Sequence, residues 1–396
     1  TPCGTLFPYT TLFRSMARFA EETGLTAADR EPRRYLWTDA FAVCNFLEIY
    51  RRTRENRFKD LALALVNQVH HTLGRHREDD PRTGWISGLP EAEGEQHPTR
   101  GGLRIGKKMN ERKPGDPFDQ RSEWDRDGQY YHYLTKWMQA LNQVGRETGN
   151  ETFNRWALEL ARAAHVGFTY GDPSGEGKRM HWKMSIDLSY PLVPSMGHHD
   201  PLDGYLTYHQ LQATRKKLGG DGPDLNAEIA ELAAICRGKS WVTDDPLGLG
   251  GLLSDACRAG QLITEADADL DTLMIDILED AQTGMEAYGR QNHLKLPPEY
   301  RLAFRELGLA IGLYGVDKLH GLLNQFTDRF PAEHPARSRV ESLSKYESLI
   351  QTIEQFWLDP AHQKAATWKD HLDINRVMLA TSLAPDGYLD VLKRAY

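Results

Sequence analysis

Apolar positions recur with helical spacing along most of the chain. The clearest case lies in residues 124–149, where they fall at i, i+3, i+4, i+7, i+8, i+11 and i+14 of one predicted helix: Tyr130, Tyr133, Leu134, Trp137, Met138, Leu141 and Val144. This is the period of an amphipathic helix and not the alternation of a strand. A partner helix is predicted to begin near Glu151, and Gly149-Asn150 supplies the turn between the two.

The same order of helix, short turn, second helix and longer polar connection is found elsewhere in the sequence. The first helix of each such unit is predicted to start in one of six segments, which begin near Trp37, Asp127, His198, Thr243, Pro297 and His371. In five of the six, an Asp stands near the helix start, where its carboxylate can accept hydrogen bonds from free N–H groups and meets the positive end of the helix dipole. Alternating runs rich in Val, Ile and Thr are nearly absent. The pattern predicts six helical hairpins and no central sheet.

This arrangement resembles the six-hairpin (α/α)6 toroid. That fold is shared by many glycoside hydrolases, by unsaturated glucuronyl hydrolases and by N-acylglucosamine 2-epimerases, so one fold hosts many chemistries. The resemblance implies an all-α fold, with residues 16–396 as a single toroid domain and long loops at its mouth. A helical-repeat solenoid is the main rival, but its repeats would be more uniform than the intervals of 88 and 76 residues between Asp39, Asp127 and Asp203.

The first fifteen residues differ in character from the rest of the chain. Residues 5–15, TLFPYTTLFRS, lack the charged start and the unbroken apolar stretch of a secretory signal. They resemble the translation of a sequencing adapter, which indicates an untrimmed metagenomic sequence. We therefore expect residues 1–15 to be an artefact that belongs to no domain, with the genuine chain beginning at or before Met16. A lost N-terminal signal is left open.

Composition and charge exclude several classes of protein. Of the 396 residues, 40% are hydrophobic, which is enough for a large core, and no run approaches the ~18–20 apolar residues of a membrane helix. The net charge of −8 gives no general attraction to phosphate backbones. The cysteines show no C-x-x-C spacing and are too few for a disulfide framework: Cys3, Cys44, Cys236 and Cys257. We expect a soluble, cytoplasmic protein whose partner is neither a nucleic acid nor a membrane, and the oligomeric state is left open.

Three polar connections that precede predicted helices carry the candidate chemistry. The first runs from Gly84 to Glu123, and a loop of this length inside a compact domain is usually functional or disordered. Trp85 offers a stacking face, Glu93 lies in an acidic part, and Arg100 and Arg104 lie in a basic part. The loop is either a lid whose cations hold a substrate carboxylate or phosphate, with Glu93, Arg100 and Arg104 as contacts, or a solvated charged loop.

The second connection is residues 123–128, directly before the clearest helix. Asp125 and Asp127 are two positions apart, so their side chains point in different directions, and we expect one to cap the helix while the other faces a cavity. A carboxylate between Trp124 and Tyr130 can act as a general acid, general base or nucleophile, as paired carboxylates do in glycosidases. Which of the two aspartates faces the cavity is left open.

The third connection runs from Lys178 to Gly204 and gathers histidines and aspartates: His181, Trp182, Asp187, His198, His199, Asp200 and Asp203. An imidazole titrates near neutral pH, so these histidines can transfer protons, contact a sugar or hold the structure by hydrogen bonds. Metal binding is disfavoured, because no further His stands at the i+4 spacing of H-E-x-x-H. The sequence also lacks G-x-G-x-x-G after a strand, G-x-x-x-x-G-K-[ST] and G-x-S-x-G, so we expect no metal and no cofactor.

These candidates favour an enzyme that acts on a small saccharide. The leading hypothesis is a glycoside hydrolase, acting on ordinary, acidic or unsaturated uronic sugars, in which Asp125 or Asp127 transfers the proton. Its substrate-binding candidates are Trp37, Asp39, Glu93, Arg100, Arg104, Trp124, Tyr130, His181, Trp182, Asp187, Asp203 and Tyr205.

Two alternatives remain. The first is a sugar 2-epimerase or isomerase, in which His199 or His198 is the base and His181 or His371 stands opposite. The second is a non-catalytic helical toroid that binds a partner.

Overall fold

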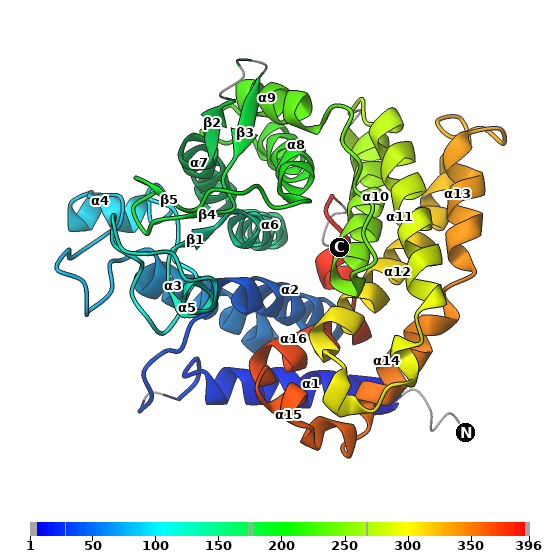
Figure 1. Ribbon diagram of the computed structural model, residues 1–396, viewed down its shortest axis with the longest axis horizontal. Coiled ribbons are helices and arrows are strands. Elements are labelled where there is room, and N and C mark those ends of the chain that lie inside the picture. The colour runs from blue at the N-terminus through cyan, green and yellow to red at the C-terminus, as the bar shows by residue number, and fades with distance from the viewer. Residues whose placement is uncertain (1–5, 28, 173–174, 176, 267, 393–396) are drawn as a thin grey trace. The chain divides into compact units, whose positions relative to one another are not determined.

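The structure is a computed structural model that describes residues 6–27, 29–172, 175, 177–266 and 268–392 (Figure 1). The chain divides into two compact units. Among the described residues, the N-terminal unit comprises the part of the chain from 20 to 238, and the C-terminal unit comprises 6–19 and 239–392. Within the described residues, no helix is long and apolar enough to cross a membrane.

Three helical hairpins form most of the N-terminal unit. They are α2 (Leu36–Thr53) with α3 (Asn56–Leu73), α6 (Tyr131–Thr148) with α7 (Glu151–Phe168), and α8 (Asp200–Leu218) with α9 (Asn226–Cys236). Helix α6 packs against both α2 and α8, so the hairpin α6–α7 lies between the other two hairpins (Figure 1). Two short helices, α4 (Glu91–Gln96) and α5 (Gln120–Asp125), lie in the long connection between α3 and α6.

The strands are short and lie at the helix ends. The three-stranded sheet has the antiparallel order β1 (Gln129–Tyr130), β4 (Lys183–Met184) and β5 (Pro191–Val193), with Gln129 paired to Met184 and an irregularity at Lys183/Met184. A separate hairpin joins β2 (Thr169–Gly171) to β3 (Lys178–Met180). Strand β1 leads directly into α6, and β4 and β5 precede α8, so this small sheet fixes the amino ends of both helices.

Helix α6 is buried on several faces. The apolar stripe expected from the sequence is buried at Leu134, Trp137, Met138, Leu141 and Val144, and polar side chains on its other faces are buried too. Asn142 donates to Asn154 of α7 at 2.8 Å and accepts from Gln210 of α8 at 2.9 Å. These amide bonds satisfy buried polar groups and fix the packing of α6 against its neighbours.

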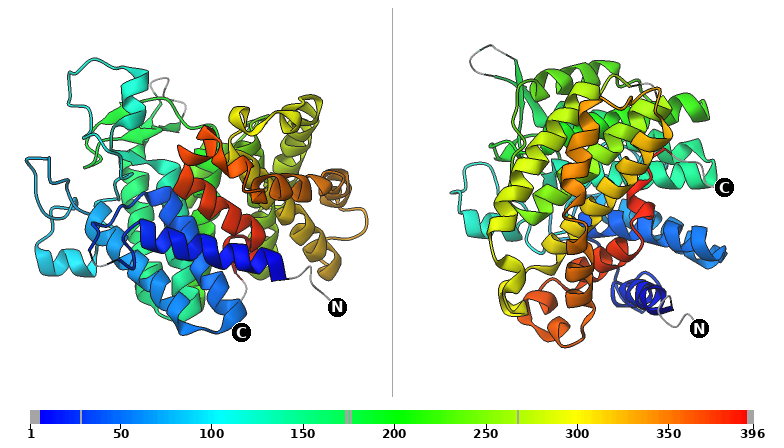
Figure 2. Two further views of the ribbon diagram at one scale, coloured as in Figure 1. Left: turned by 90° about the horizontal axis from the view of Figure 1, so that it is seen from below. Right: turned by 90° about the vertical axis from the view of Figure 1, so that its right-hand side faces the viewer.

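The C-terminal unit is also built of packed helices. Its long helices are α10 (Pro246–Ala266), α11 (Asp271–Arg290) and α12 (Ala303–Gln325), and its shorter ones are α13 (Pro335–Ser344), α14 (Ser348–Leu358), α15 (Ala366–Lys369), α16 (Leu372–Leu383) and α17 (Asp386–Leu389). Three single 3-10 turns are η1 (His293–Lys295), η2 (Pro298–Tyr300) and η3 (His362–Lys364). Helix α10 packs on α11 and α12, and α12 packs on α13, α14 and α16 (Figure 2).

Glycines bring α10 and α12 close together. A Cβ atom added at Gly250 would lie 2.0 Å from the carbonyl oxygen of Gly308, and one added at Gly312 would lie 2.5 Å from the carbonyl oxygen of Gly250. The two backbones therefore touch at a distance that only glycine permits. Gly250 is thus a packing residue of α10, whereas Gly251 next to it faces open space.

The expected all-α class of repeated helical hairpins is confirmed. All six predicted hairpin openings are followed by helices: α2, α6, α8, α10, α12 and α16. The turn at Gly149-Asn150 is also present, since Gly149 has φ +67° and the Asn150 side chain accepts a hydrogen bond from the N–H of Thr152. The last hairpin differs, because α16 is followed within the described residues only by the four-residue α17. The single domain over residues 16–396 stays a prediction.

Residues 1–5, which include Cys3, lie outside the described residues. Residues 6–15 form the first part of helix α1 (Leu6–Glu22), in which the Leu12 side chain is only 1% exposed. The origin of this segment in an adapter stays a prediction, and an untruncated genomic copy of the gene would test it. Cys44, Cys236 and Cys257 are buried side chains of the core.

Candidate active site

The amino ends of α2, α6 and α8 bring chemically active side chains together in the N-terminal unit. Tyr35 stands at the start of α2, residues 130–136 begin α6, and residues 198–203 begin α8. Because α6 packs against both other helices, these three segments meet although they lie far apart in sequence.

Aromatic rings form one side of this cluster. The hydroxyl groups of Tyr35 and Tyr133 lie 2.6 Å apart, and the Tyr130 ring lies 5.2 Å from that of Tyr133 and 5.5 Å from that of Trp182. Trp124 packs edge-on against Trp182 at 5.6 Å and remains 50% exposed. The aromatic side therefore extends from the buried Tyr130 to the exposed face of Trp124.

A buried lysine holds this aromatic side in place. Lys183 of β4 is completely buried, and its Nζ donates to Glu123 Oε1 at 2.8 Å and to the backbone carbonyls of Glu123 and Arg126. Burial lowers the pKa of Lys183, and the Glu123 carboxylate opposes this effect. Since Lys183 binds the chain on both sides of Trp124 and lies 5.3 Å from the centre of the Tyr130 ring, it fixes both aromatic side chains.

His132 and Asp200 are two titratable side chains that lie close together in the cluster. His132 Nδ1 lies 3.7 Å from Asp200 Oδ1, and the two residues come from the first turns of α6 and α8. Burial raises the pKa of Asp200 to about 8, and the nearby Asp203 carboxylate adds to this shift. Burial also lowers the pKa of His132 to about 4, with a further effect from Lys136. Near neutral pH, the imidazole is therefore unprotonated while the carboxyl group is protonated.

The second aspartate of α8 is in a different state. Both carboxylate oxygens of Asp203 lie 3.0 Å from Lys136 Nζ, and Oδ2 accepts from Thr135 Oγ1 at 2.5 Å. Asp203 is thus paired with a cation, whereas Asp200 Oδ2 is buried and has no hydrogen-bond partner within the described residues. Room for that oxygen exists because Gly197 has no Cβ, which would otherwise lie 2.2 Å from it.

Several predicted site residues belong to this cluster. Tyr130, Trp124, Trp182 and Asp203 lie in it, and His198 and His199, whose rings lie 4.5 Å apart, directly precede Asp200. Their roles in binding or catalysis stay predictions. Asp125 is exposed at the end of α5, near enough to Lys107 to oppose the lowering of its pKa by burial.

Asp127, in contrast, is not accessible to solvent. It is completely buried, its Oδ2 lies 2.6 Å from Arg104 Nη1 and 3.3 Å from Arg77 Nη1, and its Oδ1 accepts from the N–H groups of Gly106 and Gly128. Arg104 also donates to the carbonyls of Thr72 and Arg75. Asp127 does not cap α6, whose N-cap is Tyr130. We assign Asp127 and Arg104 a structural role, because neither has an oxygen or nitrogen left for a substrate.

Other predicted contacts are spread over the unit. Trp37 is buried against Phe41, and buried Asp39 accepts from the backbone N–H of Tyr35 at the start of α2. Tyr205 packs edge-on against His209, and Glu93 is exposed on α4. Trp85, which the sequence offered as a stacking face, is 2% exposed beneath Arg75 and Gly94.

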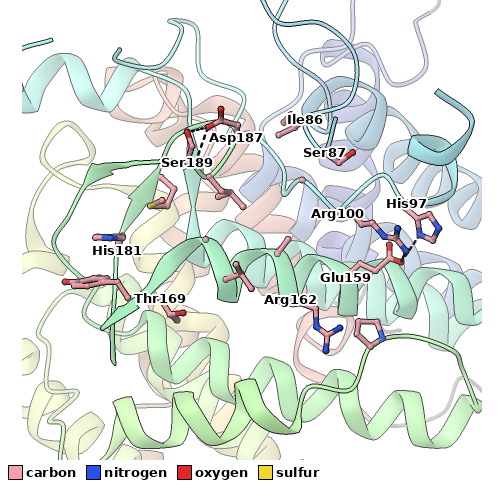
Figure 3. A pocket seen from close by; sticks show the side chains of 18 of the residues that line it. Ile86, Ser87, His97, Arg100, Glu159, Arg162, Thr169, His181, Asp187 and Ser189 are labelled. Atoms are coloured by element: carbon pink, nitrogen blue, oxygen red, sulfur yellow. Dashed lines mark hydrogen bonds and ion pairs between the residues drawn. The ribbon is translucent and has the colours of Figure 1, made fainter. Parts of the chain in front are cut away.

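Three further candidates line a separate cavity of about 1030 Å³ beside α7: Arg100, His181 and Asp187 (Figure 3). His371 belongs to the C-terminal unit, where its ring packs edge-on against Phe304 at 5.3 Å. The basic residue Arg100 of the loop and the histidine His181 of the third connection thus share one site, but it is not the site at the helix ends.

The sequence analysis missed His132, Lys136 and Tyr35 as site residues. The sequence did contain an indication of this site. His132 and Lys136 are four positions apart and therefore share one face of the most clearly predicted helix. Two titratable residues on one face near the start of this helix are therefore candidates for a common site. Among the described residues, no three His, Cys, Asp or Glu side chains are placed to hold a metal ion.

No model of a known protein family matches the chain, and no curated protein matches it. Two solved structures are similar to it. The cellobiose 2-epimerase from Spirochaeta thermophila DSM 6192 superimposes with a TM-score of 0.46 and 11% sequence identity over 87% of this chain and 86% of that one. A D-mannose isomerase gives a TM-score of 0.46 and 12% identity over 83% of this chain and 85% of that one. These values leave the activity to be argued from the chemistry of the site.

Proposed function

We propose that the protein is a sugar isomerase or 2-epimerase that moves a proton on and off carbon. The observation that carries this proposal is that His132 Nδ1 and Asp200 Oδ1 lie 3.7 Å apart, where burial lowers the pKa of the imidazole to about 4 and raises the pKa of the carboxyl group to about 8. A base must be unprotonated and an acid protonated at the same pH, and this pair meets both conditions at neutral pH.

The proposed reaction starts from an open-chain aldose. His132 removes the proton from C2 while Asp200 gives its proton to the carbonyl oxygen at C1, which yields a neutral enediol. Return of a proton to C2 on the opposite face, with loss of the proton from the C1 oxygen, gives the 2-epimer. Delivery of the proton to C1, with loss of the proton from the C2 oxygen, gives the ketose. His198 and His199 stay candidates for the second imidazole that inversion at C2 requires.

The aromatic side supports a sugar as the substrate class. A sugar ring has flat faces of C–H groups, which pack on aromatic rings, and Trp124 offers half of its surface to solvent beside Trp182 and Tyr130. Lys136 and the hydroxyl groups of Tyr35 and Tyr133 supply polar groups for sugar hydroxyls around this face.

A solvent-exchange experiment tests the proposal. Purified protein is incubated with glucose, mannose or fructose in D₂O, and NMR measures deuterium at C1 and C2 of substrate and product. We expect deuterium at one of these carbons, with the exchange rate reduced by about 10²–10⁴-fold in His132→Gln and Asp200→Asn. His71→Gln, which changes a half-exposed histidine paired with Glu95, is the matched control and should keep the rate. Absence of exchange with all three sugars would refute the proposal.

A glycoside hydrolase is the second candidate function. The observation that favours it is Asp200, whose pKa is raised by burial to about 8, three residues before Asp203, which is paired with Lys136, since glycosidases use one carboxyl as acid and one as carboxylate. Release of reducing sugar from oligosaccharides, without deuterium exchange at carbon, would select this candidate instead.

A further inference from the structure

The cavity beside α7 is separate from the cluster at the helix ends. One wall is the outer face of α7, with Arg155, Glu159, Arg162 and Val166, and the opposite wall is the turn 185–189 (Figure 3). The residues at the amino ends of α2, α6 and α8 do not line it. Its volume of about 1030 Å³ matches the size range of small-molecule sites.

Arg155 is the cation of this cavity that lacks a partner. Within the described part of the chain, its guanidinium makes no hydrogen bond or ion pair, and its Nε is buried. The other charges are largely satisfied: Glu159 Oε1 lies 2.7 Å from His97 Nδ1 and 3.3 Å from Arg100 Nη2, and Asp187 pairs with Arg82 at 2.8 Å. A guanidinium left without an anion in a walled cavity is a site for an anion of the ligand.

Glu159 provides a second polar group whose hydrogen-bonding capacity is not satisfied within the described residues. Its Oε1 serves His97 and Arg100, whereas its Oε2 is buried and accepts no hydrogen bond within the described residues. A carboxylate oxygen without a donor is costly to bury, and a hydroxyl group of a ligand would satisfy it. Arg162, one turn further along the same face of α7, is half-exposed, and its long contacts are with Glu228 at 3.4 Å and the Asp224 carbonyl at 3.3 Å.

The opposite wall of the cavity is strained and firmly held. Leu188 has φ +60°, a left-handed conformation that is unfavourable for a non-glycine residue and is concentrated at functional sites. The turn is kept in place because Ser185 Oγ and Ser189 N both donate to Asp187 Oδ1. The Leu188 side chain rests on Gly167 of α7, so the two walls are joined at this point.

Apolar and aromatic surfaces complete the cavity. Val166 is 73% exposed on the face of α7, and Ile86, Met184 and Leu188 also line the cavity. At one end, Tyr170 and His181 are stacked with their ring centres 4.2 Å apart. These surfaces suit the C–H face of a ring that carries hydroxyl groups.

We propose that this cavity binds a small hydroxylated anion, either a sugar acid or a sugar phosphate. Its carboxylate or phosphate binds Arg155, with Arg100 and Arg162 adding to the positive potential. One of its hydroxyl groups donates to Glu159, and its apolar face lies on Val166 and Leu188.

Calorimetric titration of the intact chain with glucuronate, glucose 6-phosphate and uncharged glucose tests this proposal. We expect one of the two anions to bind at a single site, at least about tenfold more tightly than glucose, because a hydrogen bond to a charged group contributes ~1.5–3 kcal/mol. Arg155→Gln should weaken binding by about 10–100-fold, and Arg162→Gln by less. The preferred anion tells whether the group recognised is a carboxylate or a phosphate.

Two control variants distinguish binding in this cavity from binding elsewhere on the protein. Arg237→Gln removes an exposed arginine of the same unit outside the cavity, and Asp200→Asn changes the candidate active site, and both should leave the affinity unchanged. Thermal unfolding shows whether Arg155→Gln is folded, and surface-exposed Arg162→Gln serves where it is not. The proposal is overturned if neither anion binds, if the arginine variants bind as well as the wild type, or if Asp200→Asn abolishes binding. The last result would place the ligand at the candidate active site.

Discussion

The protonation state of Asp200 has a direct consequence for stability. The pKa of this carboxyl group is raised by burial from 3.8 to about 8 in the folded protein, while the unfolded chain keeps the ordinary value. Between these two values, the unfolded state has lost the proton and the folded state still holds it, so the free energy of unfolding falls as the pH rises. His132 contributes in the opposite direction: its pKa is lowered to about 4, so its contribution is lost as the pH falls from 6.5 towards 4.

Replacing Asp200 with Asn isolates the first of these effects. Asn has the shape of a protonated Asp but cannot ionise, so the variant lacks the pH-dependent cost. Each unit of pKa difference corresponds to about 1.4 kcal/mol, and between pH 4 and pH 7 the wild type should lose roughly 3–4 kcal/mol relative to Asp200→Asn. Near pH 4, the two proteins should unfold at similar urea concentrations.

Urea unfolding at pH 4, 5.5, 7 and 8.5, followed by circular dichroism, measures the difference. Subtracting the variant from the wild type cancels every titration that the two proteins share. The reasoning would be refuted if Asp200→Asn were the less stable protein at neutral pH. That result would mean that Asp200 is an anion paired with a protonated His132, and the proposed acid and base would then both be in the wrong state.

The remaining predictions concern packing. Asp127→Asn should destabilise the protein by about 3–5 kcal/mol, because it leaves the buried Arg104 without its anion, whereas Arg77 keeps Asp79 as a partner. Asp125→Asn at an exposed position should change stability by less than about 0.5 kcal/mol. Equal effects in urea unfolding would contradict the structural role of Asp127. Gly250→Ala should cost about 1–3 kcal/mol, because its Cβ would lie 2.0 Å from the Gly308 carbonyl oxygen, while Gly251→Ala has open space and should gain ~0.5–1 kcal/mol from helix propensity. Thermal unfolding of both glycine variants checks this, and a stable Gly250→Ala would show that α10 and α12 can separate without cost.

Local features of the fold were accessible from the sequence because their causes are local. The stripe from Leu134 to Val144 has the period of one helix, and Gly149-Asn150 combines a residue that adopts positive φ with a good N-cap. The same reasoning could not tell a packing glycine from a flexible one. Gly250 and Gly251 are neighbours in sequence, and only the approach of α12 makes the first irreplaceable.

The roles of the two aspartates before α6 illustrate the limit. The sequence places Asp125 and Asp127 on different sides of the chain, and it also contains Arg104 as a separate candidate for binding substrate. Only the folded loop brings Arg104 within 2.6 Å of Asp127 and so converts two proposed functional groups into one structural ion pair. Arg104 and Asp127 are 23 positions apart in the sequence, and this separation does not predict that their side chains are in contact.

The sequence by itself determined the helical class, the six hairpin openings and the kinds of side chain gathered before α6 and α8, since periodicity, turn residues and capping act over a few residues. The tertiary structure decided which of those side chains lie together and which are buried. His132 and Asp200 are 68 positions apart, and the packing of α6 against α8 both brings them to 3.7 Å and removes the water that sets their ordinary pKa values. Burial depends on all the surrounding elements at once, so only the folded unit fixes it.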